Sequence, residues 1–171
     1  MTADEGAPRD HSAGASLTAV VTVTATGEVG YPPNPSWQRQ WQDLLAARAV
    51  VAAYFAGEGP DNQEAGRAVE AGCAASSSLA ENLPDRQAGM DYRAANPALK
   101  DALDLFDTTK HGVRHEGKTS GHVATAERCE FKVDPQGPVR PRETLELLTA
   151  CCDAWAVHLR RIGLAVEWPE A

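Results

Sequence analysis

Hydrophobic residues recur every three or four positions in four segments of this chain, and that spacing is typical of α-helices that bury one face. The first predicted helix begins at Asn34, a good N-cap residue, and ends before Gly57. The second begins at Asp61, which Glu64 follows in a capping-box pattern, and ends before Pro84. Its inner stripe consists of small residues, so a neighbouring helix can approach it closely.

The third predicted helix has Asn96 as its N-cap, Leu99, Leu103 and Phe106 as its buried anchors, and Gly112 as its end. Residues 84–95, which precede it, are predicted to be a polar connector with at most a short turn of helix.

The last helix begins near Pro141 and shows the strongest helical periodicity in the chain. Gly163 and Leu164 suit a Schellman ending, in which Leu164 packs back on the final turn.

Two segments alternate hydrophobic and polar residues with a period of two, which predicts strands. They are residues 17–26 and 123–133, and residues 139–140 are predicted to return as a short strand beside the second. Glu127 breaks the alternation because it falls on the inner face. Residues 112–122 are glycine-rich and are predicted to be a mobile loop.

The expected fold is mainly α: a four-helix bundle-like domain with a small antiparallel β element, made of an N-terminal strand plus a hairpin before the last helix. Residues 17–165 form the single domain, residues 1–16 a disordered tail and residues 166–171 a C-terminal tail. The expected bundle core is aromatic and aliphatic: Trp37, Trp41, Leu103, Phe106, Leu148 and Trp155.

Charge and composition narrow the function classes. The formal net charge of -8 argues against a broad basic face for nucleic acid, although a local RNA site stays open. There are four cysteines without CxxC spacing, which predicts buried free thiols in a reducing compartment. The N-terminus does not resemble a secretory signal, and no apolar run is long enough to span a membrane, so we expect a cytoplasmic protein.

The densest group of chemically active side chains is Asp107, Lys110, His111, Arg114 and His115. Asp107 and His111 are four residues apart, so a carboxylate at this helix end can orient an imidazole for general base catalysis. The neighbouring cations could hold a phosphate. Helix termination alone also selects Lys and His in a last turn before glycine, so a purely structural interpretation stands beside the catalytic one.

Arg48 falls within the apolar stripe of the first helix. Burial of its charge requires a partner, and Asp104 or Asp107 would serve and would tie the first helix to the cluster. The alternative is that Arg48 lies at the edge of the stripe and reaches water.

A metal site formed by His111, His115 and His122 is a third interpretation, but Gly112 interrupts the helical turn that would bring the first two together. We expect no metal and no other cofactor.

The order of elements, with an Asp-x-x-Lys-His-Gly motif and a last helix that carries Trp155, resembles a group of uncharacterised bacterial proteins with a HEPN-like helical core. The resemblance covers residues 35–165. That superfamily includes ribonucleases and inactive members, and its catalytic members resemble one another in an Arg followed by His after four to six residues. Here Arg114 precedes His122 with seven residues between them, so the resemblance implies an inactive or differently active member.

The leading functional hypothesis is a non-enzymatic or accessory protein that acts through a protein partner or as a homodimer. It predicts that light scattering detects a dimer, or that the protein retains a specific partner. A strict monomer without a partner would count against it. A metal-dependent hydrolase is an alternative, and elemental analysis of untagged protein tests it.

The rival hypothesis is a metal-independent ribonuclease or phosphoryl-processing enzyme that uses Asp107, His111 and Arg114. It predicts that the purified protein cleaves RNA, and that His111→Ala abolishes cleavage while the melting temperature falls by no more than a few degrees. Failure to cleave a varied set of RNA substrates would remove it.

Overall fold

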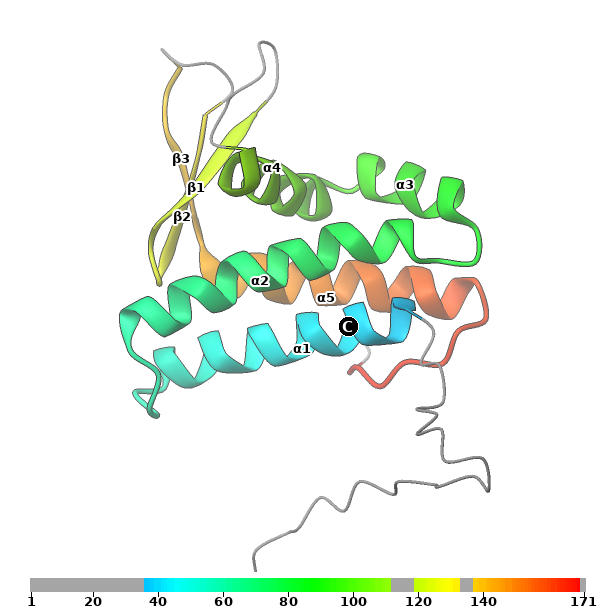
Figure 1. Cartoon of the computed structure of the whole chain (residues 1–171), viewed down its shortest axis with the longest axis horizontal. Helices are drawn as coiled ribbons and strands as arrows, with labels where there is room; N and C mark the ends of the chain where they lie inside the picture. Colours follow the sequence, from blue (N-terminus) through cyan, green and yellow to red (C-terminus); the bar gives the residue numbers. More distant parts are fainter. Residues whose placement is uncertain (1–35, 112–118, 133–136, 170–171) are drawn as a thin grey trace, which may run out of the picture. The chain divides into compact units, whose positions relative to one another are not determined.

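The computed structural model describes residues 36–111, 119–132 and 137–169. This part of the chain is mainly helical with a small antiparallel sheet, and a hairpin precedes the last helix, as the sequence predicts (Figure 1). The predicted tail 1–16 and strand 17–26 lie outside the described residues. The elements are, in order, α1 (Ser36–Phe55), α2 (Asn62–Glu81), α3 (Arg86–Ala95), α4 (Pro97–His111), β1 (Ser120–Thr125), β2 (Arg128–Lys132), β3 (Arg140–Glu143) and α5 (Thr144–Arg161).

Helix α2 is the centre of the helical layer and packs against each of the other four helices (Figure 1). Its small residues permit this, as the sequence predicts. A Cβ atom added at Gly72 would lie 2.8 Å from Leu148 Cδ2 on α5 and 3.0 Å from Ala47 Cβ on α1. The Asp61 side chain caps the helix by accepting from the Glu64 backbone N–H at 2.7 Å, which confirms the predicted start.

Residues 86–95 form a full helix, α3, and the prediction of a polar connector is wrong there. The carboxylate of Asp85 accepts a hydrogen bond from the Ala88 N–H at 3.0 Å and caps it. Gly89 brings α3 so close to α2 that a Cβ atom would lie 2.7 Å from the Ala80 carbonyl oxygen. Ten residues are too few to form a stable helix alone, so these tertiary contacts stabilise α3.

Helix α4 begins as predicted, because Asn96 Oδ1 accepts from two backbone N–H groups in its first turn. Its buried face differs from the predicted one. The predicted anchor Leu99 is fully buried, and so is Leu105, which was not predicted, whereas the predicted anchors Leu103 and Phe106 are only partly buried. The helix is rotated so that Leu103 faces α3. The other predicted core residues are buried: Trp37, Trp41, Leu148 and Trp155.

The segment predicted as one strand over residues 123–133 is a hairpin with a turn at Ala126–Glu127. The anomalous polar Glu127 marks this turn. Asn62 Oδ1 accepts from the Ala126 N–H at 3.0 Å, and Thr144 donates to the Ala126 carbonyl, so α2 and α5 hold this turn at its buried residue, Ala126. Strand β1 also begins at Ser120, inside the predicted loop 112–122.

The third strand of the sheet extends to Glu143, so α5 starts at Thr144 rather than near Pro141. Two arginines of β3 connect the sheet to α4. Arg140 and Arg142 donate to the two carboxylate oxygens of Asp101 at 2.7 and 2.9 Å. Asp101 is only 7% exposed, and a carboxylate buried to that extent requires such partners.

The C-terminus of α5 is the predicted Schellman motif. Gly163 has a φ of 82°, and the Leu164 N–H donates to the Leu159 carbonyl at 2.9 Å. The segment beyond it returns over α1, where Trp168 packs edge-on against Trp41 with ring centroids 6.2 Å apart.

The four cysteines are buried and free, as predicted. In the part of the chain that the structure describes, no helix is long and apolar enough to cross a membrane.

We expect Gly89→Ala to destabilise the protein by about 1–3 kcal/mol, because the new methyl group overlaps the α2 backbone and α3 has to move. Gly66→Ala is the matched control, since nothing lies within 4 Å of its added Cβ atom. Gly66 is also helical, so this variant should gain about 0.5–1 kcal/mol. Thermal unfolding of both variants measures the difference, and equal melting temperatures would contradict the close packing.

Candidate functional site: the cleft between α3 and α4

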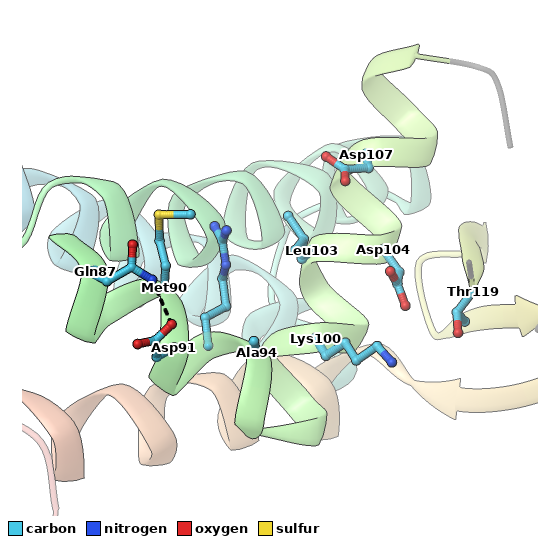
Figure 2. Close-up of a pocket in the computed structure, with 10 residues that line it drawn as sticks. Gln87, Met90, Asp91, Ala94, Lys100, Leu103, Asp104, Asp107 and Thr119 are labelled. Atoms are coloured by element: carbon cyan, nitrogen blue, oxygen red, sulfur yellow. Dashed lines mark hydrogen bonds between the residues drawn. The ribbon is translucent and has the colours of Figure 1, made fainter. Parts of the chain in front are cut away.

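A cleft of about 610 Å³ lies between α3 and α4, beside the start of β1 (Figure 2). Met90 and Leu103 face this space from the two helices (Figure 2). The lining combines apolar and charged side chains: Gln87, Met90, Asp91, Arg93, Ala94, Lys100, Leu103, Asp104, Asp107 and Thr119.

The α3 wall of the cleft is held by polar contacts to two other helices. Arg93 Nη1 donates to the Ser77 carbonyl on α2 at 2.7 Å and lies 3.9 Å from Glu81 Oε1. The Tyr92 hydroxyl donates to the Ala154 carbonyl on α5 at 2.9 Å, and its ring stacks on His158 with centroids 4.2 Å apart. These contacts preform the cleft.

Asp104 is the most perturbed carboxylate in the described chain. The pKa of Asp104 is raised from 3.8 to about 6. Burial is the largest cause and the nearby carboxylates of Asp101 and Asp107 add to it, whereas the charge of Lys100 and a hydrogen bond with Thr119 act in the opposite direction. Figure 2 shows Asp104 directed toward Thr119. Its Oδ2 atom is buried and has no hydrogen-bond partner among the described residues, which is costly for a charged group.

The charges on the cleft wall are unevenly compensated. Arg93 donates a hydrogen bond to the Ser77 carbonyl and pairs with the Glu81 carboxylate. Asp91 accepts a hydrogen bond from the neutral Gln87 amide at 2.8 Å. Across the described ranges, neither Asp91, Asp104 nor Asp107 forms an ion pair. The wall therefore carries negative charge that no arginine neutralises.

The structure places only part of the predicted Asp–His cluster. Asp107 lines the cleft, with its carboxylate on the α3 side of α4 (Figure 2). Lys110 lies over the Phe106 ring, 5.6 Å from its centroid. His111 is the last residue of α4. Arg114 and His115 lie outside the described residues, so the catalytic role of the cluster stays a prediction.

Arg48 does not pair with Asp104 or Asp107, and that predicted link to the cluster is wrong. Its Nε donates to the Thr149 hydroxyl on α5 at 3.0 Å, and its guanidinium lies 5.1 Å from the centroid of the Trp168 ring. A cation over an aromatic face needs no carboxylate partner. Arg48 therefore fixes the C-terminal segment to α1 and α5.

Within the described ranges, no three His, Cys, Asp or Glu side chains are grouped closely enough to hold a metal ion. His122 is one of the candidate ligands, and its Nε2 atom lies 3.4 Å from Oε2 of Glu130 on the neighbouring strand of the hairpin.

Comparison of the chain with protein-family models, with curated proteins and with solved structures finds no match.

The sequence prediction does not contain the cleft, because it has a connector in place of α3. Two local signals were available: Asp85 directly after Pro84 is a good N-cap, and residues 86–95 contain several strong helix formers. Neither signal shows that Leu103 would face the cleft, since that depends on how α3 packs.

Asp104→Asn tests the electrostatic state of the cleft. The folded pKa of Asp104 is about 6 and the ordinary value is 3.8, so the folded state binds the proton more tightly and the ionised form is destabilised above pH 6. The near-isosteric amide removes this penalty, and we expect a gain of about 1–3 kcal/mol at neutral pH.

The gain should shrink as the pH falls from 6 toward 3.8, because wild-type Asp104 becomes protonated in that range. Urea unfolding at several pH values measures it. A gain that is independent of pH, or a loss at neutral pH, would contradict the unfavourable burial of this carboxylate.

Proposed function

We propose that this protein is a non-catalytic binding protein, and that its site is the cleft between α3 and α4, which takes a small organic molecule. The observation that carries the proposal is the cleft itself, a space of about 610 Å³ with apolar side chains between charged ones. Small-molecule sites in proteins typically have volumes of about 300–1,000 Å³ and combine an apolar lining with a few polar groups.

Two further features support binding at this place. The wall formed by α3 is fixed through Arg93 and Tyr92, so little order has to be gained when a ligand enters. The buried Oδ2 atom of Asp104 has no partner in the described chain, and a perturbed carboxylate beside a cleft is typical of functional sites.

The proposal refines the non-enzymatic hypothesis from the sequence. Homodimerisation and a protein partner stay predictions, with light scattering as their test. The ribonuclease alternative also stays a prediction, and Asp107 is the one member of its catalytic set whose side chain is described at the cleft. RNA cleavage that requires His111 would replace the binding proposal with that alternative.

Ala94→Trp should block the cleft. Ala94 lines the cleft and is exposed on α3, so the indole fills the space with little effect on the core. Ala95→Trp is the matched control, because Ala95 is also exposed on α3 but does not line the cleft. Amide chemical shifts of ¹⁵N-labelled protein are followed while small amines, carboxylates and alcohols are added.

We expect at least one class of probe to shift the amides of cleft residues in the wild type and in Ala95→Trp, and to lose at least about tenfold in affinity in Ala94→Trp, which is about 1.4 kcal/mol. Probes that leave the cleft amides unchanged, or that bind equally to both variants, would overturn the proposal.

A further inference from the structure

We infer that the ligand of the α3–α4 cleft is an organic cation, an ammonium group on a short apolar chain, and that the Asp104 carboxylate is its principal polar contact. This inference rests on the proposed function and adds the chemical class of the ligand.

The charges of the side chains that line the cleft do not balance. Three carboxylates and two cationic side chains line the cleft. Arg93 is only 8% exposed, and the carboxylate with which it pairs is Glu81, 3.9 Å from its Nη1 atom, which does not line the cleft. In the described chain Asp104 and Asp107 form no ion pair. The uncompensated charge of the cleft is negative, which favours a cation.

Lys100 is the other cation on the wall of the cleft. It is one turn before Asp104 on α4 and exposed. Its charge lowers the pKa of Asp104, but the combined effect of burial and of the carboxylates Asp101 and Asp107 exceeds it. Lys100 therefore leaves the ionised form of Asp104 insufficiently stabilised, and a ligand cation that excludes water would stabilise it more.

Asp104 has a carboxylate oxygen that is not used as a hydrogen-bond acceptor by the described residues. Its Oδ2 atom is buried without a partner in the described residues, and an ionised carboxylate accepts at both oxygens. Rotation of the terminal carboxyl torsion is inexpensive and would present this oxygen to the cleft. A primary ammonium supplies three donors, and charge-assisted bonds of this kind are about twice as strong as neutral ones.

The apolar side chains of the cleft can accommodate the apolar part of the ligand. Met90 and Ala94 on α3 and Leu103 on α4 line the same cleft. Methylene groups of an alkyl chain can pack between them, and the flexible Met90 side chain can adapt to the chain. The site thus combines an acidic end with an apolar wall.

The test compares three probes of one shape: pentylamine, pentanoate and 1-pentanol. Each is titrated into ¹⁵N-labelled full-length protein at about pH 7.5, and cleft amide shifts give the dissociation constants. We expect pentylamine to bind at least about tenfold more tightly than 1-pentanol, a difference that one charge-assisted contact accounts for. Equal or tighter binding of pentanoate or 1-pentanol would overturn the inference.

Asp104→Asn should abolish this preference, so that pentylamine binds within about threefold of 1-pentanol. Glu58→Gln is the matched control. Glu58 is exposed in the loop between α1 and α2 and does not line the cleft, and its substitution removes the same formal charge. An equal loss of pentylamine affinity in both variants would mean that net charge alone is responsible, and would overturn the role of Asp104.

The pH dependence gives a second readout. Below pH 6 Asp104 becomes protonated, so pentylamine affinity should fall between about pH 7.5 and 5 in the wild type, and change less in Asp104→Asn. An affinity that is constant over this range would contradict the assignment. The groups that act on Asp104 are Lys100, Asp101 and Asp107 on α4, through their charges, and Thr119 before β1, through a hydrogen bond. Asp91 and Arg93 are the charged side chains that α3 contributes to the same cleft.

The two proposals fail in different ways. If pentanoate or 1-pentanol shifts the cleft amides and pentylamine does not, the cleft is a binding site but the ligand is not a cation. If none of the probes, at millimolar concentration, shifts the cleft amides, the proposed binding function fails as well.

Discussion

The close packing of neighbouring helices on the small residues of α2 is the constraint on which the rest of the structure depends. Gly72 allows α1 and α5 to approach. One turn later Ser76 accepts a hydrogen bond from the Trp155 indole N–H at 3.0 Å, and the Ser77 carbonyl accepts from Arg93. Further along α2, the Ala80 carbonyl oxygen lies so close to Gly89 that α3 has no room for a Cβ atom there. Larger side chains along this helix would separate the layers, so the position of α3, and with it the cleft, follows from the surface of α2.

Two acidic residues of α4, three positions apart, show how the same side chain behaves when it is buried with and without charged partners. Asp101 is buried and receives hydrogen bonds from Arg140 and Arg142, so its charge is compensated and it joins the sheet to the helices. Asp104 is also partly buried, yet no arginine reaches it in the described chain, and its pKa is raised to about 6. Unfavourable groups of this kind are typical of functional sites, which is why Asp104 is central to the proposed ligand contact.

The candidate site from the sequence and the cleft from the structure meet at Asp107. Charged residues that follow one another at the end of α4 stand out in the sequence, because a sequence displays the local density of such residues. The cleft instead lies between α4 and a helix that precedes it, and its perturbed carboxylate is Asp104, which the sequence suggests only as a partner for Arg48. Arg48 interacts with Thr149 and Trp168 instead.

The sequence by itself determined the features that depend on neighbouring residues: the caps Asp61 and Asn96, the Schellman motif at Gly163 and the mainly helical composition. These are local hydrogen bonds and local periodicities. Only the tertiary structure decided that α4 buries Leu105 rather than Leu103, that the chain turns at Ala126, and that residues 86–95 form a helix at all. Each of these outcomes depends on contacts with residues distant in the chain, whose free energy exceeds the weak local preferences of these segments.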